Sequence, residues 1–220
     1  MNCLPQNIQP AEEYYGNTRA EILSLLPERV DRILEIGCGA GNTLQRIKAE
    51  KGCAWAGGAE LFPDAAREAR SKIDQVYEGN IESMELPIPE GSLDVILCLD
   101  VLEHLVDPWR MIQRLHPLLK QGGVLIASIP NVRYYKISLA LLCKGEWEYG
   151  EEGILDRTHL RFFTLASARR LMESSGLRID EGSATGLEYG RWSRRINKLT
   201  LSLFKPLLEY QYLLRARRVD

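Results

Sequence analysis

Short apolar runs along the chain alternate with segments whose apolar residues recur at the spacing of a helix. The runs predict five strands, at residues 32–37, 53–60, 75–79, 93–100 and 122–131. The segments between them predict helices at residues 42–50, 63–72 and 107–115, after a first amphipathic helix at residues 11–26. Repeated strand–helix alternation of this kind indicates an α/β fold with a doubly wound parallel sheet.

Two segments add detail to this picture. Residues 93–100, "LDVILCLD", form an almost continuous apolar run, which is typical of a central parallel strand covered on both faces. The helix at residues 107–115 begins with Asp107 as its N-cap and Pro108 at its first position. After residue 131 the pattern stops for about thirty residues, which is long for a connection in a compact domain and predicts a functional lid at residues 132–163.

The composition limits the class of protein. The 220 residues are 45% hydrophobic and 26% charged, which suits one soluble domain over residues 1–220. A net charge of −2 gives no reason to expect a nucleic-acid partner. The five cysteines contain no C-x-x-C pair, the N-terminus does not resemble a signal peptide, and no run reaches the ~18 apolar residues of a membrane span. We therefore expect a cytoplasmic protein.

The predicted sheet indicates where to look for chemistry. In open α/β sheets the ligand lies beyond the carboxyl ends of the strands, so the residues that directly follow the apolar runs are the first candidates. These residues are Glu35–Gly41, Glu60, Asn80, Asp100 and Asn131.

The turn after the first strand has glycines at positions 37, 39 and 41, which let the backbone approach a ligand without a Cβ in the way. A dinucleotide-binding turn, G-x-G-x-x-G, would need its last glycine at Asn42. No tyrosine has a lysine four residues on, as Tyr-x-x-x-Lys reductases require. An NAD-dependent reductase is thus a disfavoured alternative. The pattern E-x-G-x-G-x-G at residues 35–41 instead resembles the first motif of class I S-adenosylmethionine-dependent methyltransferases.

Two further segments resemble the same family. Residues 93–108, "LDVILCLDVLEHLVDP", are similar to the fourth-strand motif of ubiquinone-biosynthesis-type and related small-molecule methyltransferases. Residues 155–164, "LDRTHLRFFT", look like a segment of methyltransferases clustered with bacterial sugar and cell-surface polysaccharide biosynthesis. The resemblance implies a Rossmann-like sheet of about seven strands with the last strand antiparallel. It also implies a cofactor-binding core at residues 30–131, and C-terminal helices and last strands at residues 164–220.

The resemblance implies S-adenosylmethionine as the cofactor and S-adenosylhomocysteine as the product. Glu60 would accept hydrogen bonds from the two ribose hydroxyls, although it also fits a solvated acid at a helix start. Asn80 and Ile81 would contact the adenine, and the glycine turn would contact the amino-acid end. Tyr15 and Arg19 would close over the cofactor's carboxylate or, alternatively, pack against the glycine turn. The whole predicted set is Tyr15, Arg19, Glu35, Gly37, Cys38, Gly39, Glu60, Leu61, Asn80, Ile81, Leu99, Asp100 and Glu103.

The implied reaction is methyl transfer to a hydroxyl of a small molecule, with a sugar or a cell-surface polysaccharide precursor as the acceptor. A positioned base assists such a nucleophile by removing its proton. His159, with Asp156 as its orienting partner, is the first candidate, and His104 is the rival. Alternatively, Asp156, Arg157 and Arg161 form a cluster of ion pairs that fastens the lid. A protein that keeps the fold and the cofactor but has lost turnover is a further alternative.

A metal site is also considered at the end of the fourth strand. Asp100, Glu103 and His104 form an acid-x-x-Glu-His run, similar to the metal-binding segment suggested for some ubiquinone-type methyltransferases. Such a set of residues is common at helix starts, and further oxygen ligands are lacking nearby in the sequence. We therefore predict no metal site.

The C-terminal segment is more basic than the rest of the chain. From Arg191 onward it carries eight Lys or Arg residues against two acids, a charge of +6. Trp192, Ile196, Leu199 and Leu203 recur at helical spacing, which predicts a basic amphipathic helix. Such a helix binds an anionic membrane surface, or it docks on the sheet or on a partner subunit in a homodimer. We favour docking.

Overall fold

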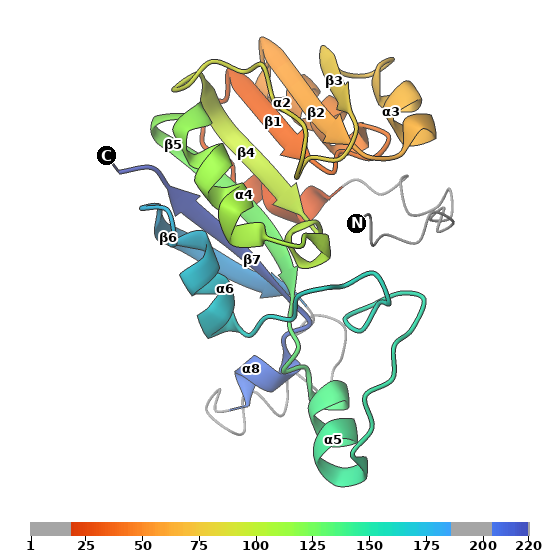
Figure 1. The fold of residues 1–220 in the computed structure, drawn as a ribbon. Coiled ribbons are helices and arrows are strands. Elements are labelled where there is room, and N and C mark those ends of the chain that lie inside the picture. The colour runs from red at the N-terminus through yellow and green to blue at the C-terminus, as the bar shows by residue number, and fades with distance from the viewer. Residues whose placement is uncertain (1–18, 186–203, 220) are drawn as a thin grey trace.

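The computed structural model describes residues 19–185 and 204–219, and a seven-stranded sheet forms its centre (Figure 1). The order across the sheet is β3-β2-β1-β4-β5-β7-β6, and β7 alone runs antiparallel to its neighbours. This confirms the predicted doubly wound sheet and its reversed last strand. The strands are β1 (Arg32–Ile36), β2 (Trp55–Glu60), β3 (Gln75–Glu78), β4 (Leu93–Leu99), β5 (Leu119–Pro130), β6 (Arg178–Thr185) and β7 (Gln211–Arg217).

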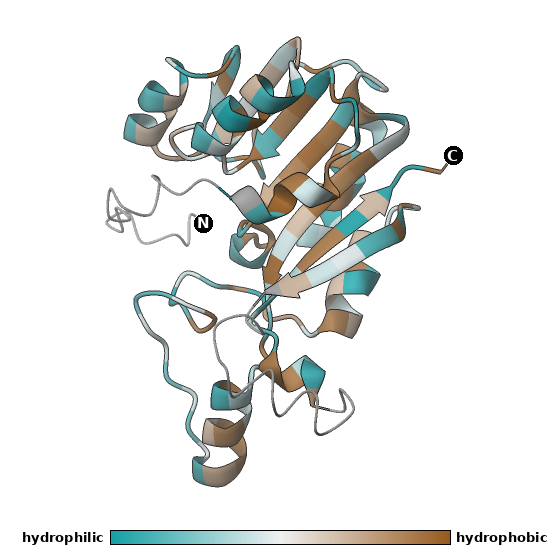
Figure 2. Cartoon of the chain, turned by 180° about the vertical axis from the view of Figure 1, so that it is seen from behind, coloured by the Kyte–Doolittle hydropathy of each residue, from teal (hydrophilic) through white to brown (hydrophobic). Residues whose placement is uncertain are grey.

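Helical segments cover both faces of the sheet. η1 (Ala20–Leu25), α2 (Asn42–Lys51) and α3 (Pro63–Ala69) pack on one face, and α4 (Pro108–Leu115) and α6 (Leu165–Met172) pack on the other. In β4, Val95 and Leu97 enter the first of these cores, whereas Ile96 and Cys98 enter the second. The strands in the middle of the sheet are accordingly among the most hydrophobic parts of the chain (Figure 2). The continuous apolar run of β4 is thus explained by burial on both sides.

Local sequence signals set the starts of two helices. Asp107 caps α4 by accepting a hydrogen bond from the backbone N of Arg110 at 3.0 Å, and Pro108 occupies the first turn, as predicted. Thr164 caps α6 in a capping box with Ser167. These two helices lie side by side over the same face of the sheet, so the caps fix where that layer begins.

The lid leaves the sheet after β5 and returns to the same place. Asn131 and Phe163 form a bridge at its base, and the backbone N of Val132 donates to the carbonyl oxygen of Phe163 at 3.0 Å. Between these ends lie α5 (Tyr135–Lys144) and an irregular loop, which extend away from the sheet (Figure 1). None of the ten residues of α5 is buried. The lid is therefore attached to the sheet at its base, and the side chains of α5 at its tip are not buried.

Two of the predicted helices lie partly or wholly outside the described residues. Residues 11–18 of the first helix are outside the described residues, and residues 20–25 form a 3-10 helix rather than an α-helix. The helix ends at Leu25 because Leu26, which precedes Pro27, is extended, as is favoured for a residue before proline. The predicted basic helix lies in residues 186–203, outside the described residues, and is followed by α8 (Lys205–Leu208). No helix in the described part of the chain is long and apolar enough to cross a membrane.

Candidate active site

The glycine turn lies between β1 and α2 and depends on the left-handed backbone conformation. Gly37, Gly39 and Gly41 have φ angles of +71°, +52° and +77°, which side chains other than glycine rarely adopt. A Cβ on Gly41 would lie 3.2 Å from the backbone of Ala69, so this glycine also permits close packing of α3. The thiol of Cys38 is buried against Gly58 of β2, so Cys38 offers a ligand only its backbone.

Glu60 connects the end of β2 to the glycine turn. One of its carboxylate oxygens accepts a hydrogen bond from the backbone N of Gly39 at 2.8 Å, and the other accepts one from Phe62 N at 2.9 Å. The side chain is buried, and burial raises the pKa of Glu60. Each carboxylate oxygen has a second lone pair, so the group can accept two further hydrogen bonds. Leu61, next in the chain, is exposed.

Glu35 is a buried carboxyl group near the glycine turn. Burial raises its pKa to about 8, against the favourable charge of Arg19. Its Oε2 atom has no hydrogen-bond partner among the described residues. A buried acid with an unpaired oxygen is costly unless a donor or a cation reaches it, so this position fits a cationic group of a ligand.

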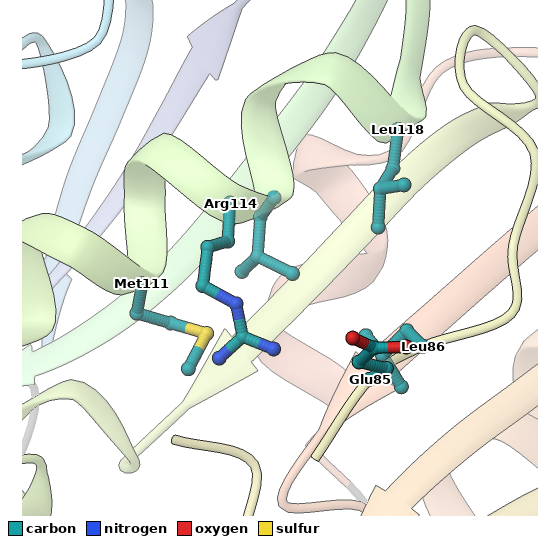
Figure 3. Close-up of a pocket in the computed structure, with 6 residues that line it drawn as sticks. Glu85, Leu86, Met111, Arg114 and Leu118 are labelled. Atoms are coloured by element: carbon teal, nitrogen blue, oxygen red, sulfur yellow. The ribbon is translucent and has the colours of Figure 1, made fainter. Parts of the chain in front are cut away.

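The turn after β3 holds the two predicted adenine contacts. The side chain of Asn80 accepts a hydrogen bond from Glu82 N at 2.9 Å, whereas Ile81 is mostly buried in the core. Arg114 of α4 fixes this turn by donating to the carbonyl oxygens of Ile81 at 2.7 Å and Glu82 at 3.2 Å. Beside Arg114 lies a cavity of about 290 Å³ (Figure 3), lined by Glu85, Leu86, Met111, Arg114, Leu115 and Leu118.

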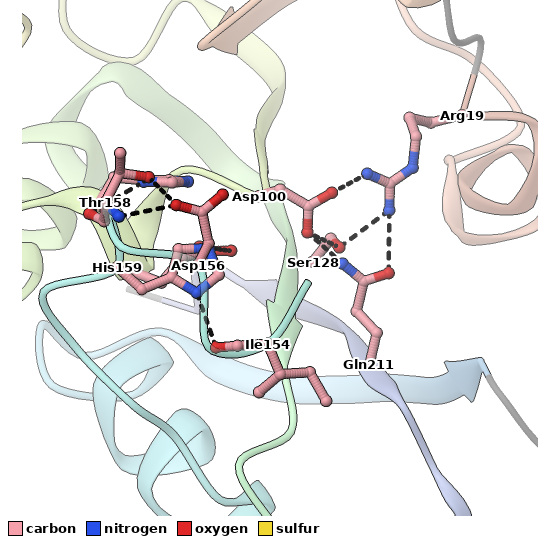
Figure 4. Close-up of polar contacts among 10 residues, drawn as sticks. Arg19, Asp100, Ser128, Ile154, Asp156, Thr158, His159 and Gln211 are labelled. Atoms are coloured by element: carbon pink, nitrogen blue, oxygen red, sulfur yellow. Dashed lines mark hydrogen bonds and ion pairs between the residues drawn. The ribbon is translucent and has the colours of Figure 1, made fainter. Parts of the chain in front are cut away.

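Asp100 follows β4 and contacts polar side chains from three segments that are distant in the sequence. Its φ of +55° is the only positive value at a non-glycine residue in the described part of the chain. Its carboxylate accepts a hydrogen bond from Ser128 Oγ at 2.9 Å and pairs with Arg19 and Gln211 (Figure 4). Arg19 also donates to Ser128 Oγ at 3.0 Å. The structure thus places Arg19 at the predicted edge of the sheet, beside the buried Leu99.

The end of the lid docks on η2 (Leu102–His104), directly after Asp100. The carbonyl oxygen of Glu103 accepts hydrogen bonds from Leu160 N at 2.8 Å and Arg161 N at 2.9 Å. The guanidinium group of Arg161 donates to the carbonyl oxygen of Val106. The two motifs that resemble methyltransferase segments, "LEH" and "LDRTHLRFFT", are therefore in direct contact.

Two histidines meet where the lid docks. The rings of His104 and His159 lie edge to face with their centroids 4.6 Å apart. His104 Nδ1 lies 3.0 Å from Thr158 Oγ1 and 3.3 Å from the carbonyl oxygen of Thr158. Burial, followed by the neighbouring His159, lowers the pKa of His104. His104 is therefore predominantly neutral at neutral pH and can accept a proton.

The prediction that Asp156 orients His159 is wrong. His159 Nδ1 instead lies 2.9 Å from the carbonyl oxygen of Ile154, and its Nε2 faces the carboxyl group of Glu103 at 4.0 Å (Figure 4). Asp156 turns toward Thr158, because an aspartate in a turn accepts a hydrogen bond from the residue two positions on. The alternative ion-pair cluster is not formed either among the described residues, since Arg157 pairs with Glu151 at 2.8 Å.

Glu103 completes this group of side chains. It is 1% exposed, and burial raises its pKa well above its usual range. Neither of its carboxyl oxygens has a hydrogen-bond partner among the described residues. One atom each of Glu103, His104 and His159 lies within 4.8 Å of the others, an arrangement that could hold a metal ion. The acid-x-x-Glu-His run considered as a metal site also included Asp100. The carboxylate of Asp100 instead contacts Arg19, Ser128 and Gln211.

The chain is similar to known methyltransferases. A family model described as a methyltransferase domain matches residues 11–181. The chain belongs to this methyltransferase family. The methyltransferase is 28% identical over 203 residues to a ubiquinone biosynthesis O-methyltransferase of Xanthomonas euvesicatoria pv. vesicatoria, a match that covers 86% of the chain and 76% of that protein. It is 27% identical over 189 residues to a probable S-adenosylmethionine-dependent methyltransferase of Mycolicibacterium smegmatis, covering 78% of the chain but 62% of that protein.

A solved structure supports the fold. A Haloferax volcanii methyltransferase, in complex with the Trm112 methyltransferase activator, matches with a TM-score of 0.65 at 17% identity, over 95% of this chain and 92% of that one. The expected Rossmann-like class and S-adenosylmethionine as the cofactor are thus confirmed. The roles of individual residues stay predictions, and Tyr15 lies outside the described residues. The sequence did not point to Thr158, Ser128 or Gln211, because polar pairs far apart in the chain have no periodicity.

Proposed function

We propose that this methyltransferase moves a methyl group from S-adenosylmethionine to a hydroxyl of a small molecule, with a sugar or a cell-surface polysaccharide precursor as the acceptor. The observation that supports it most is the position of His104, which lies at the carboxyl edge of the sheet next to the predicted cofactor residues, with its Nδ1 held by Thr158 and its pKa lowered by burial. An alcohol must lose a proton during methylation, so it gains from such a base. The name of the Xanthomonas relative, an O-methyltransferase, supports oxygen as the acceptor atom.

The residues at this edge fit the cofactor. When bound, S-adenosylmethionine supplies an electrophilic methyl group and a sulfur leaving group. The free lone pairs of Glu60 suit the two ribose hydroxyls, and the unpaired Oε2 of Glu35 suits the ammonium group. Asn80 keeps its NH₂ group for the adenine, since its oxygen already accepts from Glu82 N. The glycine turn leaves room for the backbone to approach the amino-acid end.

His104 removes the proton of the acceptor. No hydrogen bond reaches its Nε2 from the described residues, whereas both partners of Nδ1 are oxygens of Thr158. Nε2 would therefore take the hydroxyl proton, while the bound cofactor would supply the methyl group and the sulfur leaving group. The products are a methyl ether and S-adenosylhomocysteine, and the imidazolium returns its proton to water. A positioned base contributes about 10²–10⁴-fold to such a step.

The test begins with calorimetric titration of S-adenosylmethionine, S-adenosylhomocysteine and NADH. We expect micromolar binding of the two sulfur compounds and none of NADH. S-adenosylhomocysteine release is then measured with nucleotide sugars, free sugars, phenols and amines. Cofactor binding without turnover on any acceptor would favour the alternative of a protein that has lost catalysis.

The base is tested on the accepted substrate. His104→Gln should lower kcat by about 10²–10⁴-fold and leave the Kd for the cofactor unchanged. His116→Gln, at the end of α4, is the matched control and should retain activity. Full activity of His104→Gln would exclude His104 as the base. Activity lost in a chelator and restored by a divalent metal would also contradict it, because Nε2 would then be a ligand.

These experiments do not address where the protein is located or what it assembles with. A cytoplasmic location, a homodimer and contact with an anionic membrane stay predictions, and the basic helix on which the last two depend lies outside the described residues.

A further inference from the structure

A chain of hydrogen bonds connects a carboxylate of the lid to the imidazole of His104. Asp156 Oδ1 accepts a hydrogen bond from Thr158 Oγ1 at 2.7 Å and another from Thr158 N at 2.7 Å. Thr158 Oγ1 then lies 3.0 Å from His104 Nδ1. The three side chains belong to two segments that are 54 residues apart in sequence and meet only where the lid docks on η2.

The direction of each hydrogen bond follows from the chemistry of its partners. The Asp156 carboxylate can only accept, so the single hydrogen of the Thr158 hydroxyl points to it. Toward His104, Thr158 Oγ1 can then only accept, and the carbonyl oxygen of Thr158 is also an acceptor. Both neighbours of Nδ1 therefore require a hydrogen on this nitrogen. In a neutral imidazole, this arrangement leaves the lone pair on Nε2.

We propose that Thr158 is a positioning residue of the methyltransferase, which transmits the orientation of Asp156 to His104 and keeps Nε2 of His104 as the proton acceptor. This inference rests on the proposed function, in which His104 is the base. It gives Asp156 a role different from the predicted one, since its carboxylate acts on His104 through a hydroxyl rather than on His159. In this role Thr158 acts through His104 and not on the acceptor itself.

The surroundings of His159 support this division of roles. Its Nδ1 must carry a hydrogen, because the carbonyl oxygen of Ile154 lies 2.9 Å away. Its Nε2 faces Glu103, and the side chain is 8% exposed, so neither nitrogen is open to a substrate. His159 instead packs edge to face on the ring of His104, which limits the rotation of that ring. The lid thus holds His104 by two different contacts.

The experiment compares Thr158→Val with Thr158→Ser in the full chain. Valine keeps the shape of threonine but has no hydroxyl, whereas serine keeps the hydroxyl. We expect Thr158→Val to lower kcat by roughly 2- to 10-fold, the factor that corresponds to losing one neutral hydrogen bond, with the KM for the acceptor and the Kd for the cofactor unchanged. Thr158→Ser should recover most of this loss. In the nitrogen NMR spectrum of the wild type, His104 should carry its hydrogen on Nδ1, and Thr158→Val should move part of it to Nε2.

The outcomes separate this inference from the proposed function. If His104→Gln is inactive but Thr158→Val keeps both kcat and the His104 tautomer, Thr158 has no positioning role while His104 remains the base. If His104→Gln is fully active, the proposed function itself fails. If Val and Ser lose activity equally, or cofactor affinity falls together with kcat, Thr158 acts only in folding the lid. Asp156→Asn, which keeps an acceptor oxygen but loses the charge, replaces Thr158→Val if valine prevents folding, and should lower kcat in the same way.

Discussion

Replacing Glu60 by glutamine tests the predicted cofactor site with the smallest change in shape. Both carboxylate oxygens of Glu60 accept backbone hydrogen bonds, from Gly39 N at 2.8 Å and Phe62 N at 2.9 Å. Glutamine has one oxygen and one NH₂ group, and the NH₂ group can only donate. One of these two N–H groups, both of which lie in partly buried contacts, therefore loses its acceptor in Glu60→Gln.

The size of both effects follows from these contacts. A fully buried donor without a partner costs about 1–3 kcal/mol of unfolding free energy, so the loss for these partly buried groups is at the lower end, about 1 kcal/mol. In cofactor binding, hydrogen bonds to a charged acceptor contribute about 1.5–3 kcal/mol, compared with about 0.5–1.5 kcal/mol for neutral pairs. For two ribose hydroxyls the loss is roughly 2–3 kcal/mol, which corresponds to a rise in Kd of about 30- to 150-fold.

The assay is calorimetric titration of S-adenosylhomocysteine, with urea unfolding in parallel. A pH of 8 keeps the variants comparable, because burial raises the pKa of Glu60 and the wild type must be ionised. Glu78→Gln is the matched control, since Glu78 pairs with Glu60 across β2 and β3 but is exposed and bound to Arg70 at 2.8 Å. Its Kd should equal that of the wild type. A lowered stability of Glu60→Gln with an unchanged Kd would refute the ribose contact and leave Glu60 only its connection to the glycine turn.

Three further predictions concern polar groups in or beside the core. Burial raises the folded-state pKa of Glu35 to about 8, above the ordinary value of 4.5, so rising pH destabilises the wild type across this window. Relative to Glu35→Gln, its unfolding free energy should fall by up to ~1.4 kcal/mol per pH unit, measured with urea at pH 5, 7 and 9. Asn131→Ala loses hydrogen bonds to Pro206 O and Glu209 O and should lower the unfolding free energy by about 2–4 kcal/mol in urea at pH 7. Arg114→Met deprives the turn after β3 of its donors and should raise the cofactor Kd by roughly 3- to 10-fold in calorimetry.

For each of these three variants, one outcome would contradict the prediction. Parallel pH profiles for wild type and Glu35→Gln would mean that Glu35 keeps an ordinary pKa in the folded protein. Wild-type stability of Asn131→Ala would show that the base of the lid is held by backbone contacts alone. An unchanged Kd for Arg114→Met would separate the turn after β3 from cofactor binding.

The sheet could be predicted from the sequence because buried positions recur as apolar residues at regular spacing. β4 is apolar on both faces and therefore appears as a continuous run, and Asp107 marks the start of α4 by its capping chemistry. The direction of β7 came from the family resemblance, since period alone carries no direction. The polar contacts of the site could not be predicted in this way. Asp100 and Arg19 are 81 residues apart, and no spacing rule connects them.

The error over Asp156 has a local cause. Asp156 is three residues from His159 in the sequence, which favoured a direct contact. The lid instead forms a tight turn there, with Asp156 N donating to Gly153 O and His159 N donating to Asp156 O. This turn points the carboxylate at Thr158, whose hydroxyl lies against His104, while His159 Nδ1 lies against the carbonyl oxygen of Ile154. Proximity in sequence indicated the right group of residues but not which of them touch.

If His104 acts as proposed, the closed base of the lid separates the choice of acceptor from proton transfer. The bridge between Asn131 and Phe163 and the docking of residues 158–161 on η2 fix the histidine-bearing part of the insertion to the sheet. α5 buries none of its residues and projects from this fixed base. Its length and side chains can therefore be exchanged without moving His104. Under the proposed function, α5 is therefore the segment at which a redesign for a new acceptor would begin, because it can change while the proposed base stays in place.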